Sequence, residues 1–258
     1  MGMKNFNKIS GLLITLLTVA LTACVSSFIM LCVTGADPYI FVKNEKEDKI
    51  SSAQLEPTFD YGDNYIKSIV FVGDRTIASL SDAREEVKPS QVWSGVSGSL
   101  PLDYNLATTP IIHSDDPKGA SIADAAEIYR PQYIVITVGL ENGVGHCSEV
   151  KFKEYYTRLI ESIRDGSPDT KIILQSILPV SKVAQRADPS VSNDRIDVAN
   201  GYIASIAEEL SVRYLNTASA LKGDDGCLDP RFDSGDGIIL NSEGYGVLIE
   251  YIRVHGYK

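Results

Sequence analysis

The strongest local pattern in the chain is SIVFVGDRTIASL, at residues 68–80. Its first half is mostly β-branched and aromatic, which is typical of a buried strand, and it leads directly into the turn residues Gly73 and Asp74. Helical spacing follows in residues 76–80. A strand, a glycine turn and a helix start place residue 75 at the carboxyl edge of a sheet, where α/β enzymes hold their nucleophiles. The residue there is Arg75, so the sequence leaves open whether this site is still catalytically active.

Apolar strands alternate with helical segments along the rest of the chain. Further strands are expected at residues 91–93, 133–138, 171–178 and 212–215, and helices at residues 121–129, 149–164, 193–210 and 242–255. Ser121 and Ser242 are the expected helix caps. Continuous apolar strands separated by helices predict a mostly parallel sheet covered on both faces, a three-layer α/β/α sandwich. Right-handed crossovers favour the flavodoxin-like strand order, with ligands bound at the carboxyl ends of the strands.

The composition is that of a globular domain with an acidic balance. Of the 258 residues, 44% are hydrophobic and 22% charged, and the net charge is −10. This charge argues against nucleic acid as a partner, and the sequence indicates no particular oligomeric state. Cysteines and histidines form no cluster with zinc spacing, so neither a metal nor another cofactor is expected. Cys147 and Cys227 are either a disulfide or two free thiols, and the sequence favours neither.

The first 34 residues are interpreted as a membrane anchor. An apolar run of 25 residues without a charge occupies residues 9–33 and follows Lys4 and Lys8. At about 1.5 Å per residue it reaches roughly 37 Å, enough to cross a hydrocarbon core of about 30 Å with some tilt. The lysines predict a single-pass protein of the cell membrane with an extracytoplasmic carboxyl-terminal domain. The alternative is a lipoprotein signal, Leu-Thr-Ala-Cys, with Cys24 as the lipidated residue.

The chain is therefore predicted to have three parts. Residues 1–34 form the anchor, residues 35–64 a stalk, and residues 65–258 the folded domain. The middle part is polar and acidic, contains Pro57 and has no sustained hydrophobic period, which is typical of a stalk that holds a domain away from a membrane.

Segments at the expected carboxyl edge resemble the motifs of the SGNH/GDSL hydrolases. These are serine esterases and acyl hydrolases of α/β sandwich fold, which often act on lipids or acylated carbohydrates. In that family a Gly-Asp-Ser motif after the first strand supplies the nucleophile, and the matching run here is Gly73-Asp74-Arg75. The family's last motif, Asp-x-x-His, supplies the base and its orienting carboxylate. Here Asp236 matches the aspartate, and Ile239 stands at the position of the histidine.

The resemblance covers about residues 65–258 and also implies where the oxyanion donors would be. A glycine after the second strand donates a backbone N–H in the family, and Gly98 is its match. An asparagine in a Gly-x-Asn motif is a further donor; here Glu141 has the strict spacing and Asn142 follows one residue late. With nucleophile and base both replaced, the resemblance implies a catalytically impaired member, because each group depends on the other.

Arg75 is expected to have an acidic partner, because a positive charge at a helix start is unfavourable by roughly 0.3–1 kcal/mol. Asp74, Glu141 and Asp236 are the candidates in the converging loops. Arginine forms carboxylate pairs well, so an ion pair inside the old catalytic pocket is the favoured interpretation. The alternatives are a guanidinium that holds an anionic ligand and one that is simply solvated.

Three functions fit these motifs. The favoured one is a membrane-tethered domain that has lost hydrolysis and keeps a pocket for a cell-envelope glycan or an acylated small molecule, a ligand class implied by the resemblance alone. The second is an active esterase or O-acyl hydrolase with noncanonical catalytic residues, for which a displaced pair of Thr76 and His146 is one candidate. The third is a structural scaffold of the cell envelope. The aromatic residues Trp93, Tyr155 and Tyr156 are interpreted as core rather than as a sugar platform.

Overall fold

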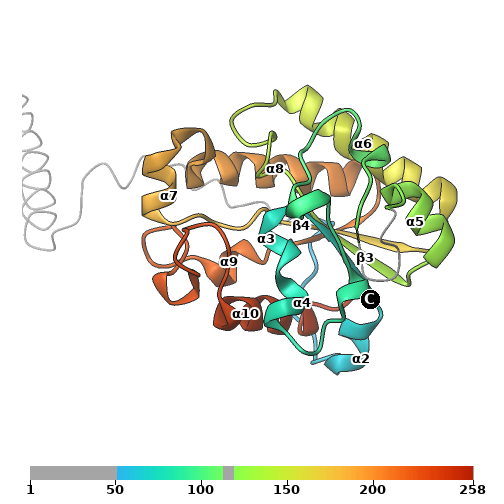
Figure 1. Ribbon diagram of the computed structural model, residues 1–258, viewed down its shortest axis with the longest axis horizontal. Coiled ribbons are helices and arrows are strands. Elements are labelled where there is room, and N and C mark those ends of the chain that lie inside the picture. Colours follow the sequence, from blue (N-terminus) through green and yellow to red (C-terminus); the bar gives the residue numbers. More distant parts are fainter. Residues whose placement is uncertain (1–50, 113–118, 258) are drawn as a thin grey trace, which may run out of the picture. The chain divides into compact units, whose positions relative to one another are not determined.

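A five-stranded sheet with the order β2-β1-β3-β4-β5 organises the domain (Figure 1). The computed structural model describes residues 51–112 and 119–257. Its strands are β1 (Ile69–Gly73), β2 (Val92–Trp93), β3 (Tyr133–Thr137), β4 (Lys171–Gln175) and β5 (Arg213–Leu215). Each neighbouring pair of strands is parallel. The predicted parallel α/β sheet and its flavodoxin-like order are therefore confirmed.

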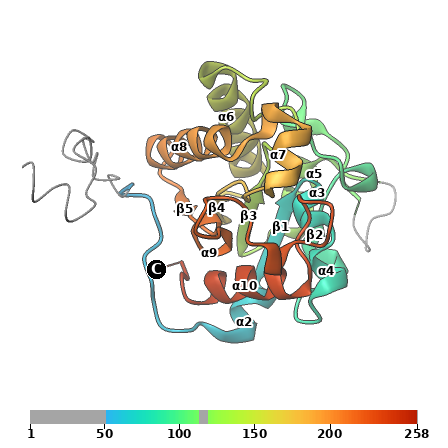
Figure 2. The same ribbon diagram turned by 90° about the vertical axis from the view of Figure 1, so that its left-hand side faces the viewer.

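Helices cover both faces of this sheet (Figure 2). The α-helices are α2 (Gly62–Lys67), α3 (Arg75–Ala78), α4 (Leu80–Ala83), α5 (Ile122–Tyr129), α6 (Glu149–Gly166), α7 (Lys182–Ala187), α8 (Asn193–Glu209), α9 (Ala218–Leu221) and α10 (Ser242–Arg253). The 3₁₀ helices are η2 (Pro89–Gln91), η3 (Val96–Gly98), η4 (Leu106–Thr108), η5 (Pro189–Val191) and η6 (Pro230–Phe232). In one apolar cluster the sheet packs against α5, α6 and α8, and in the other against α2, α9 and α10.

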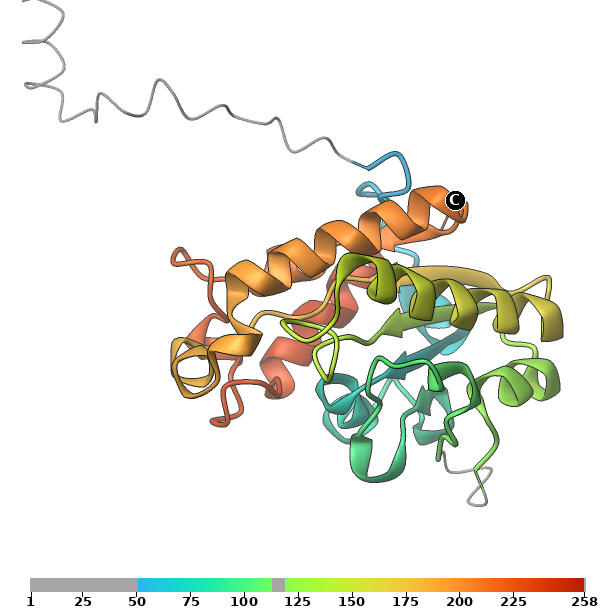
Figure 3. The same cartoon turned by 90° about the horizontal axis from the view of Figure 1, so that it is seen from above.

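The central strand β3 explains why the strands are apolar without interruption. Ile134 and Ile136 pack in the cluster with α6 and α8, whereas Val135 packs in the cluster with α10. Successive side chains point to opposite faces of a strand, so a strand buried on both faces must be apolar at every position. On the first of these faces α6 and α8 lie side by side (Figure 3).

Two details of the predicted elements are wrong. The cap of α10 is Asn241, whose side chain accepts from the N–H of Gly244, while Ser242 is the first helical residue. Asparagine and serine cap equally well, and the extended backbone at Asn241 decides between them. Strand β4 ends at Gln175 and not at residue 178, because the next segment bonds to α8: the N–H of Ile177 donates to Oδ1 of Asn200 at 2.7 Å. The cap of α5 is Ser121, as predicted.

The predicted stalk, residues 35–64, extends too far toward the carboxyl terminus. Its last part belongs to the folded domain: Ala53 and Leu55 are buried, and the segment pairs with the edge of β5. Leu55 N donates to Tyr214 O at 2.8 Å, and Tyr214 N donates to Ala53 O at 2.9 Å. Backbone pairing to an open sheet edge does not require an apolar sequence, which is why composition did not reveal this contact.

The membrane anchor stays a prediction. Residues 9–33 and the alternative lipidation site, Cys24, lie outside the described residues. Within residues 51–112 and 119–257, none of the helices has both the length and the apolar character that a membrane crossing needs.

Candidate functional site

Arg75 and Asp236 form an ion pair at the carboxyl edge of the sheet. Arg75 is the first residue of α3, directly beyond β1, and Asp236 lies in the loop between η6 and α10. Nη2 of Arg75 is 3.6 Å from Oδ2 of Asp236, and the two side chains are 44% and 39% exposed. An ion pair is thus present, with Asp236 as the partner among the three candidates, while its expected location inside a pocket stays a prediction. A pair this exposed is worth at most about 1 kcal/mol, so solvent or a ligand can replace it at little cost.

Asp74 has a different task, which is to fix the start of α3. Its Oδ1 accepts from the backbone N–H of Thr76 at 3.1 Å and from the Thr76 hydroxyl at 2.8 Å. The Asp74 side chain is buried, and this burial raises its pKa to about 6 even though both bonds to Thr76 act to lower it. The hydroxyl of Tyr245 on α10 donates to the carbonyl of Thr76 at 2.8 Å. The turn that contains Arg75 is therefore stabilised by hydrogen bonds between Thr76 and both Asp74 and Tyr245.

The Asp236 loop places Ile239 beside the ion pair. Oδ1 of Asp236 accepts from the backbone N–H groups of Ile238 and Ile239, at 2.8 and 2.7 Å. Burial acts to raise the pKa of Asp236, but these two N–H groups and Arg75 outweigh it and lower that pKa. One carboxylate therefore contacts the backbone of Ile239 through one oxygen and Arg75 through the other. The side chain of Ile239 is partly buried against the apolar cluster that includes α10.

Gly98 lies next to Arg75, as the family motif implies. A Cβ at Gly98 would be 3.0 Å from Cβ of Ala78 and 3.7 Å from Cα of Arg75, and the backbone φ is +77°. Ser94 holds the loop in place, since its hydroxyl donates to the carbonyl of Gly98 at 3.1 Å. The N–H of Gly98 already donates to the carbonyl of Gly95 at 3.0 Å. The resemblance assigns this position to an oxyanion donor, but the N–H of Gly98 is bonded to the protein's own backbone.

Asn142 and Glu141 occupy the place of the second oxyanion motif. Nδ2 of Asn142 donates to the carbonyl of Leu102 at 3.2 Å. Oε2 of Glu141 accepts from the hydroxyl of Ser99 at 2.9 Å and from the N–H of Leu100 at 3.1 Å. The Glu141 charge also acts to raise the pKa of Asp74, so the two carboxylates are close in space. The Glu141 carboxylate thus connects two loops, at the position where the Gly-x-Asn motif of the family has an amide donor. The spacing of that motif identified Glu141, but nothing in the sequence indicated Ser99 as its partner.

The displaced pair, Thr76 and His146, is not assembled in this structure. Thr76 is 2% exposed, and its hydroxyl donates to Asp74. His146 is exposed and lies near Asp188, whose pKa its charge helps to lower. The two described cysteines, Cys147 and Cys227, are both free thiols.

Trp93 and Tyr156 are buried in the core, as predicted, and Tyr155 packs against it. No group of three or more His, Cys, Asp and Glu side chains in residues 51–112 and 119–257 could hold a metal ion.

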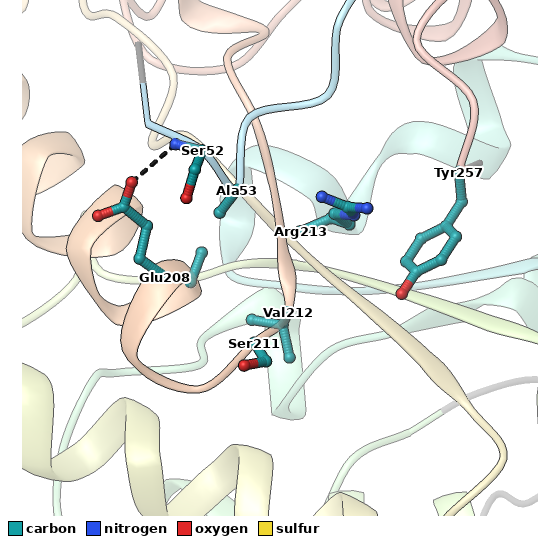
Figure 4. Close-up of a pocket in the computed structure, with 8 residues that line it drawn as sticks. Ser52, Ala53, Glu208, Ser211, Val212, Arg213 and Tyr257 are labelled. Atoms are coloured by element: carbon teal, nitrogen blue, oxygen red, sulfur yellow. Dashed lines mark hydrogen bonds between the residues drawn. The ribbon is translucent and has the colours of Figure 1, made fainter. Parts of the chain in front are cut away.

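Cavities of the described residues lie away from the ion pair, among them the following three. One of about 300 Å³ is at the amino-terminal side of β5, where Arg213 and Tyr257 face Ser52 and Glu208 (Figure 4). The Glu208 carboxylate accepts from the N–H of Ser52 at 2.7 Å. A second cavity, of about 410 Å³, includes Trp93. A third, of about 230 Å³, lies between the loop after β3 and α8. None of these three is lined by the two ion-pair residues.

Comparison with solved structures finds proteins of similar fold. A candidate platelet activating factor from Streptococcus pneumonia is 19% identical over 71% of this chain and 81% of its own, with a TM-score of 0.50. A GDSL-like lipase from Bacteroides thetaiotaomicron is 17% identical over 71% and 85%, with a TM-score of 0.48. A catalytic mutant of an acetylxylan esterase from Geobacillus stearothermophilus is 14% identical over 80% and 98%, with a TM-score of 0.46. At these identities the likeness concerns the fold alone.

The sequence comparisons identify the family. No curated protein sequence matches the chain. A family model for the GDSL-like lipase/acylhydrolases matches residues 71–247, which is more than half of the chain. This range includes Arg75, Gly98, Asn142 and Asp236, and it confirms the resemblance that their motifs indicated. The chain belongs to the GDSL-like lipase/acylhydrolase family.

Proposed function

We propose that this chain is a membrane-tethered, extracytoplasmic member of the family that binds a cell-envelope glycan or an acylated ligand without hydrolysing it. The observation that supports the proposal is the ion pair between Arg75 and Asp236, because the motif assigns the position of Arg75 to the family's nucleophile. The orienting carboxylate is retained, but it faces a guanidinium and the backbone of Ile239 instead of an imidazole.

Neither replacement side chain can perform the step that its position served. A guanidinium stays protonated in proteins and has no lone pair for attack, and an aliphatic side chain such as that of Ile239 cannot accept a proton. In a serine hydrolase the loss of nucleophile or base alone costs about four to six decades of rate. Both losses together cost little more, because the two groups act as a unit.

The oxyanion side supports the same conclusion. The N–H of Gly98 and the amide of Asn142 are both engaged with backbone carbonyls. Glu141 adds a carboxylate, which opposes the negative charge that develops in ester hydrolysis. Because one oxyanion donor is worth about 10²–10³ in rate, these arrangements remove much of what the fold could still contribute without a nucleophile.

The carboxyl edge of the sheet at Arg75 can still bind a ligand without hydrolysing it. Arg75 is partly exposed and its ion pair is weak, so an oxygen-rich ligand could replace Asp236 as its partner. The ligand class comes from the family, whose members act on acylated lipids and carbohydrates. The tether and the extracytoplasmic location rest on the apolar residues 9–33 and the lysines before them.

Hydrolysis of 4-nitrophenyl acetate by the full-length chain in detergent tests the catalytic part. We expect the rate to equal the background with the protein omitted. Turnover above background that disappears in Thr76→Ala or in His146→Ala would establish the active esterase with a displaced catalytic pair instead.

Cosedimentation with isolated cell-wall glycan tests the binding part. We expect Arg75→Ala to weaken cosedimentation of the full-length chain, while Arg186→Ala, an exposed arginine on α7, leaves it unchanged. Equal binding by both variants would remove Arg75 from the ligand site. Absence of any cosedimentation would favour a scaffold role without a glycan ligand.

A further inference from the structure

A cavity of about 230 Å³ lies between the loop that follows β3 and the first half of α8. We call it the side cavity. It is lined by residues 143–145, Cys147, Phe152, Arg195, 198–199 and Tyr202. Since a water molecule occupies about 30 Å³ in the liquid, this volume corresponds to roughly eight waters, or a small organic molecule. Arg75 and Asp236 do not line it, so it is distinct from the ion pair, although its lining begins directly after Asn142.

The floor of the side cavity is apolar and aromatic. Phe152 is 1% exposed and meets the ring of Tyr202 edge to face, with ring centroids 5.8 Å apart. Val198 on α8 is 55% exposed, which leaves an aliphatic side chain open at the rim. These walls suit an apolar group about the size of a short acyl chain, because binding would remove apolar surface of both partners from water.

The rim carries a cation. Arg195 lies in the first turn of α8, where a positive charge is unfavourable with respect to the helix dipole. Within residues 51–112 and 119–257, no carboxylate lies within 4.0 Å of its guanidinium. Nη1 of Arg195 is only 3.0 Å from the point that a Cβ at Gly145 would occupy, so the guanidinium lies directly against the loop. An anion at this rim would gain a charge-assisted hydrogen bond and offset the unfavourable dipole.

We propose that the side cavity binds a small carboxylate with an apolar tail, held by Arg195 at its head and by Phe152 and Tyr202 along its tail. This is a second binding site, and it does not depend on the function proposed for Arg75. For a ligand the size of hexanoate, a Kd of about 1 mM is expected.

Cys147 provides a reporter of occupancy. It is a partly exposed free thiol that lines the side cavity, and its Sγ donates to the carbonyl of Asn142 at 3.1 Å. Cys227 is a free thiol too, but it is buried and does not line the cavity. Burial raises the pKa of Cys147, so its alkylation will be slow enough to follow by hand. A ligand in the cavity covers the first thiol and leaves the second unaffected.

The experiment is alkylation of the full-length chain in a non-ionic detergent with iodoacetamide, with Cys147 and Cys227 followed separately by peptide mass spectrometry. At about 10 mM hexanoate, ten times the expected Kd, alkylation of Cys147 should slow about tenfold. Hexanol at the same concentration should protect far less. In Arg195→Gln the protection by hexanoate should disappear, and in Arg186→Gln, the matched exposed arginine on α7, it should remain.

Three results would overturn the proposal: an unchanged Cys147 rate with hexanoate, equal protection in Arg195→Gln, or equal protection by hexanol. The ratio of rates with and without hexanoate is the quantity to compare, because removing a nearby charge also changes the thiol's own reactivity. Esterase assays do not bear on this result, so the two proposals fail independently.

Discussion

Nη2 of Arg75 and Oδ2 of Asp236 lie 3.6 Å apart at the carboxyl edge of the sheet. In the family motif these positions belong to the nucleophile and to the carboxylate that orients its base. Arg75 thus lies beside the one residue of the last motif that the chain retains. The same carboxylate accepts the N–H of Ile239, so the two positions that the resemblance assigns to nucleophile and base both contact Asp236.

Asp74 predicts a pH dependence of stability. Its pKa is raised by burial to about 6 from the ordinary 3.8, so the folded chain favours the protonated form. The stability from this group is complete below pH of about 4 and is lost as the pH rises through about 6, a change on the order of 3 kcal/mol. Urea unfolding of the native chain and of Asp74→Asn across this range should show the variant gaining relative stability as the pH rises.

Asp236 is the contrasting case for the same measurement. Its pKa is lowered, so its stabilising contribution is present above the unfolded pKa and is lost as the pH falls. Asp236→Asn should therefore lose relative stability as the pH rises, opposite to Asp74→Asn. If the difference in unfolding free energy between the native chain and Asp74→Asn did not vary with pH, the pKa of Asp74 would not be raised by burial.

A substitution by alanine is expected to be more costly at Gly98 than at Gly226. Gly98 and Gly226 have φ values of +77° and +76°. A Cβ at Gly98 would be 3.0 Å from Cβ of Ala78, whereas no atom of the described part of the chain lies within 4 Å of a Cβ at Gly226. Alanine at either position costs about 1–2 kcal/mol for the left-handed backbone. Gly98→Ala should cost a further ~1 kcal/mol or more because of the contact with α3. Denaturant unfolding of the two variants measures the difference, and equal losses would mean that the Gly98 loop does not pack against α3.

Gln175 predicts a gain in stability. Its side chain is fully buried at the end of β4, and neither Oε1 nor Nε2 has a hydrogen-bond partner among residues 51–112 and 119–257. Gln175→Met removes two unsatisfied polar atoms at similar volume and should raise the free energy of unfolding by about 1–3 kcal/mol.

Gln91 is the matched control for this change. It is also buried, but Nε2 donates to the carbonyls of Ile66 and Ile69, and Oε1 accepts from the N–H of Lys88. Gln91→Met should therefore lower the free energy of unfolding. If Gln175→Met also destabilises the chain, the buried amide has a hydrogen-bond partner, such as an internal water.

The parallel sheet could be predicted because its pattern is local. Residues 68–80 contain a strand, a turn and a helix start in sequence, and the structure has β1, Asp74 as cap and α3 in that order. The strand order followed from the handedness of crossovers, and the partner of Arg75 was among the acidic residues of the converging loops. These features depend on neighbouring residues or on general rules of chain connection.

The rest depended on tertiary contacts that leave no local pattern. Ala53 and Leu55 pair with Tyr214 through backbone hydrogen bonds, which leave no pattern in the side chains. The polar residues around them therefore indicated a stalk. Ser99 reaches Glu141 only because the loops after β2 and β3 meet at one edge. The engaged N–H of Gly98 reflects the turn of its own loop, in which a 3₁₀ helix forms. A motif identifies the position of such a group, whereas its hydrogen-bond partner is set by the folded loop.

The most direct test of the central claim is to restore the two replaced side chains and measure hydrolysis of 4-nitrophenyl acetate. In Arg75→Ser with Ile239→His, Oδ2 of Asp236 loses its guanidinium partner and can accept from the imidazole. The control is Arg75→Ser with Ile239→Phe, a ring that cannot take a proton. We predict background hydrolysis by the native chain and by the control, and a rate at least about 10²-fold above the control for the restored pair, with a further gain from Glu141→Asn. A correctly folded restored variant that stays at background, or a native chain that already hydrolyses the ester, would contradict the account.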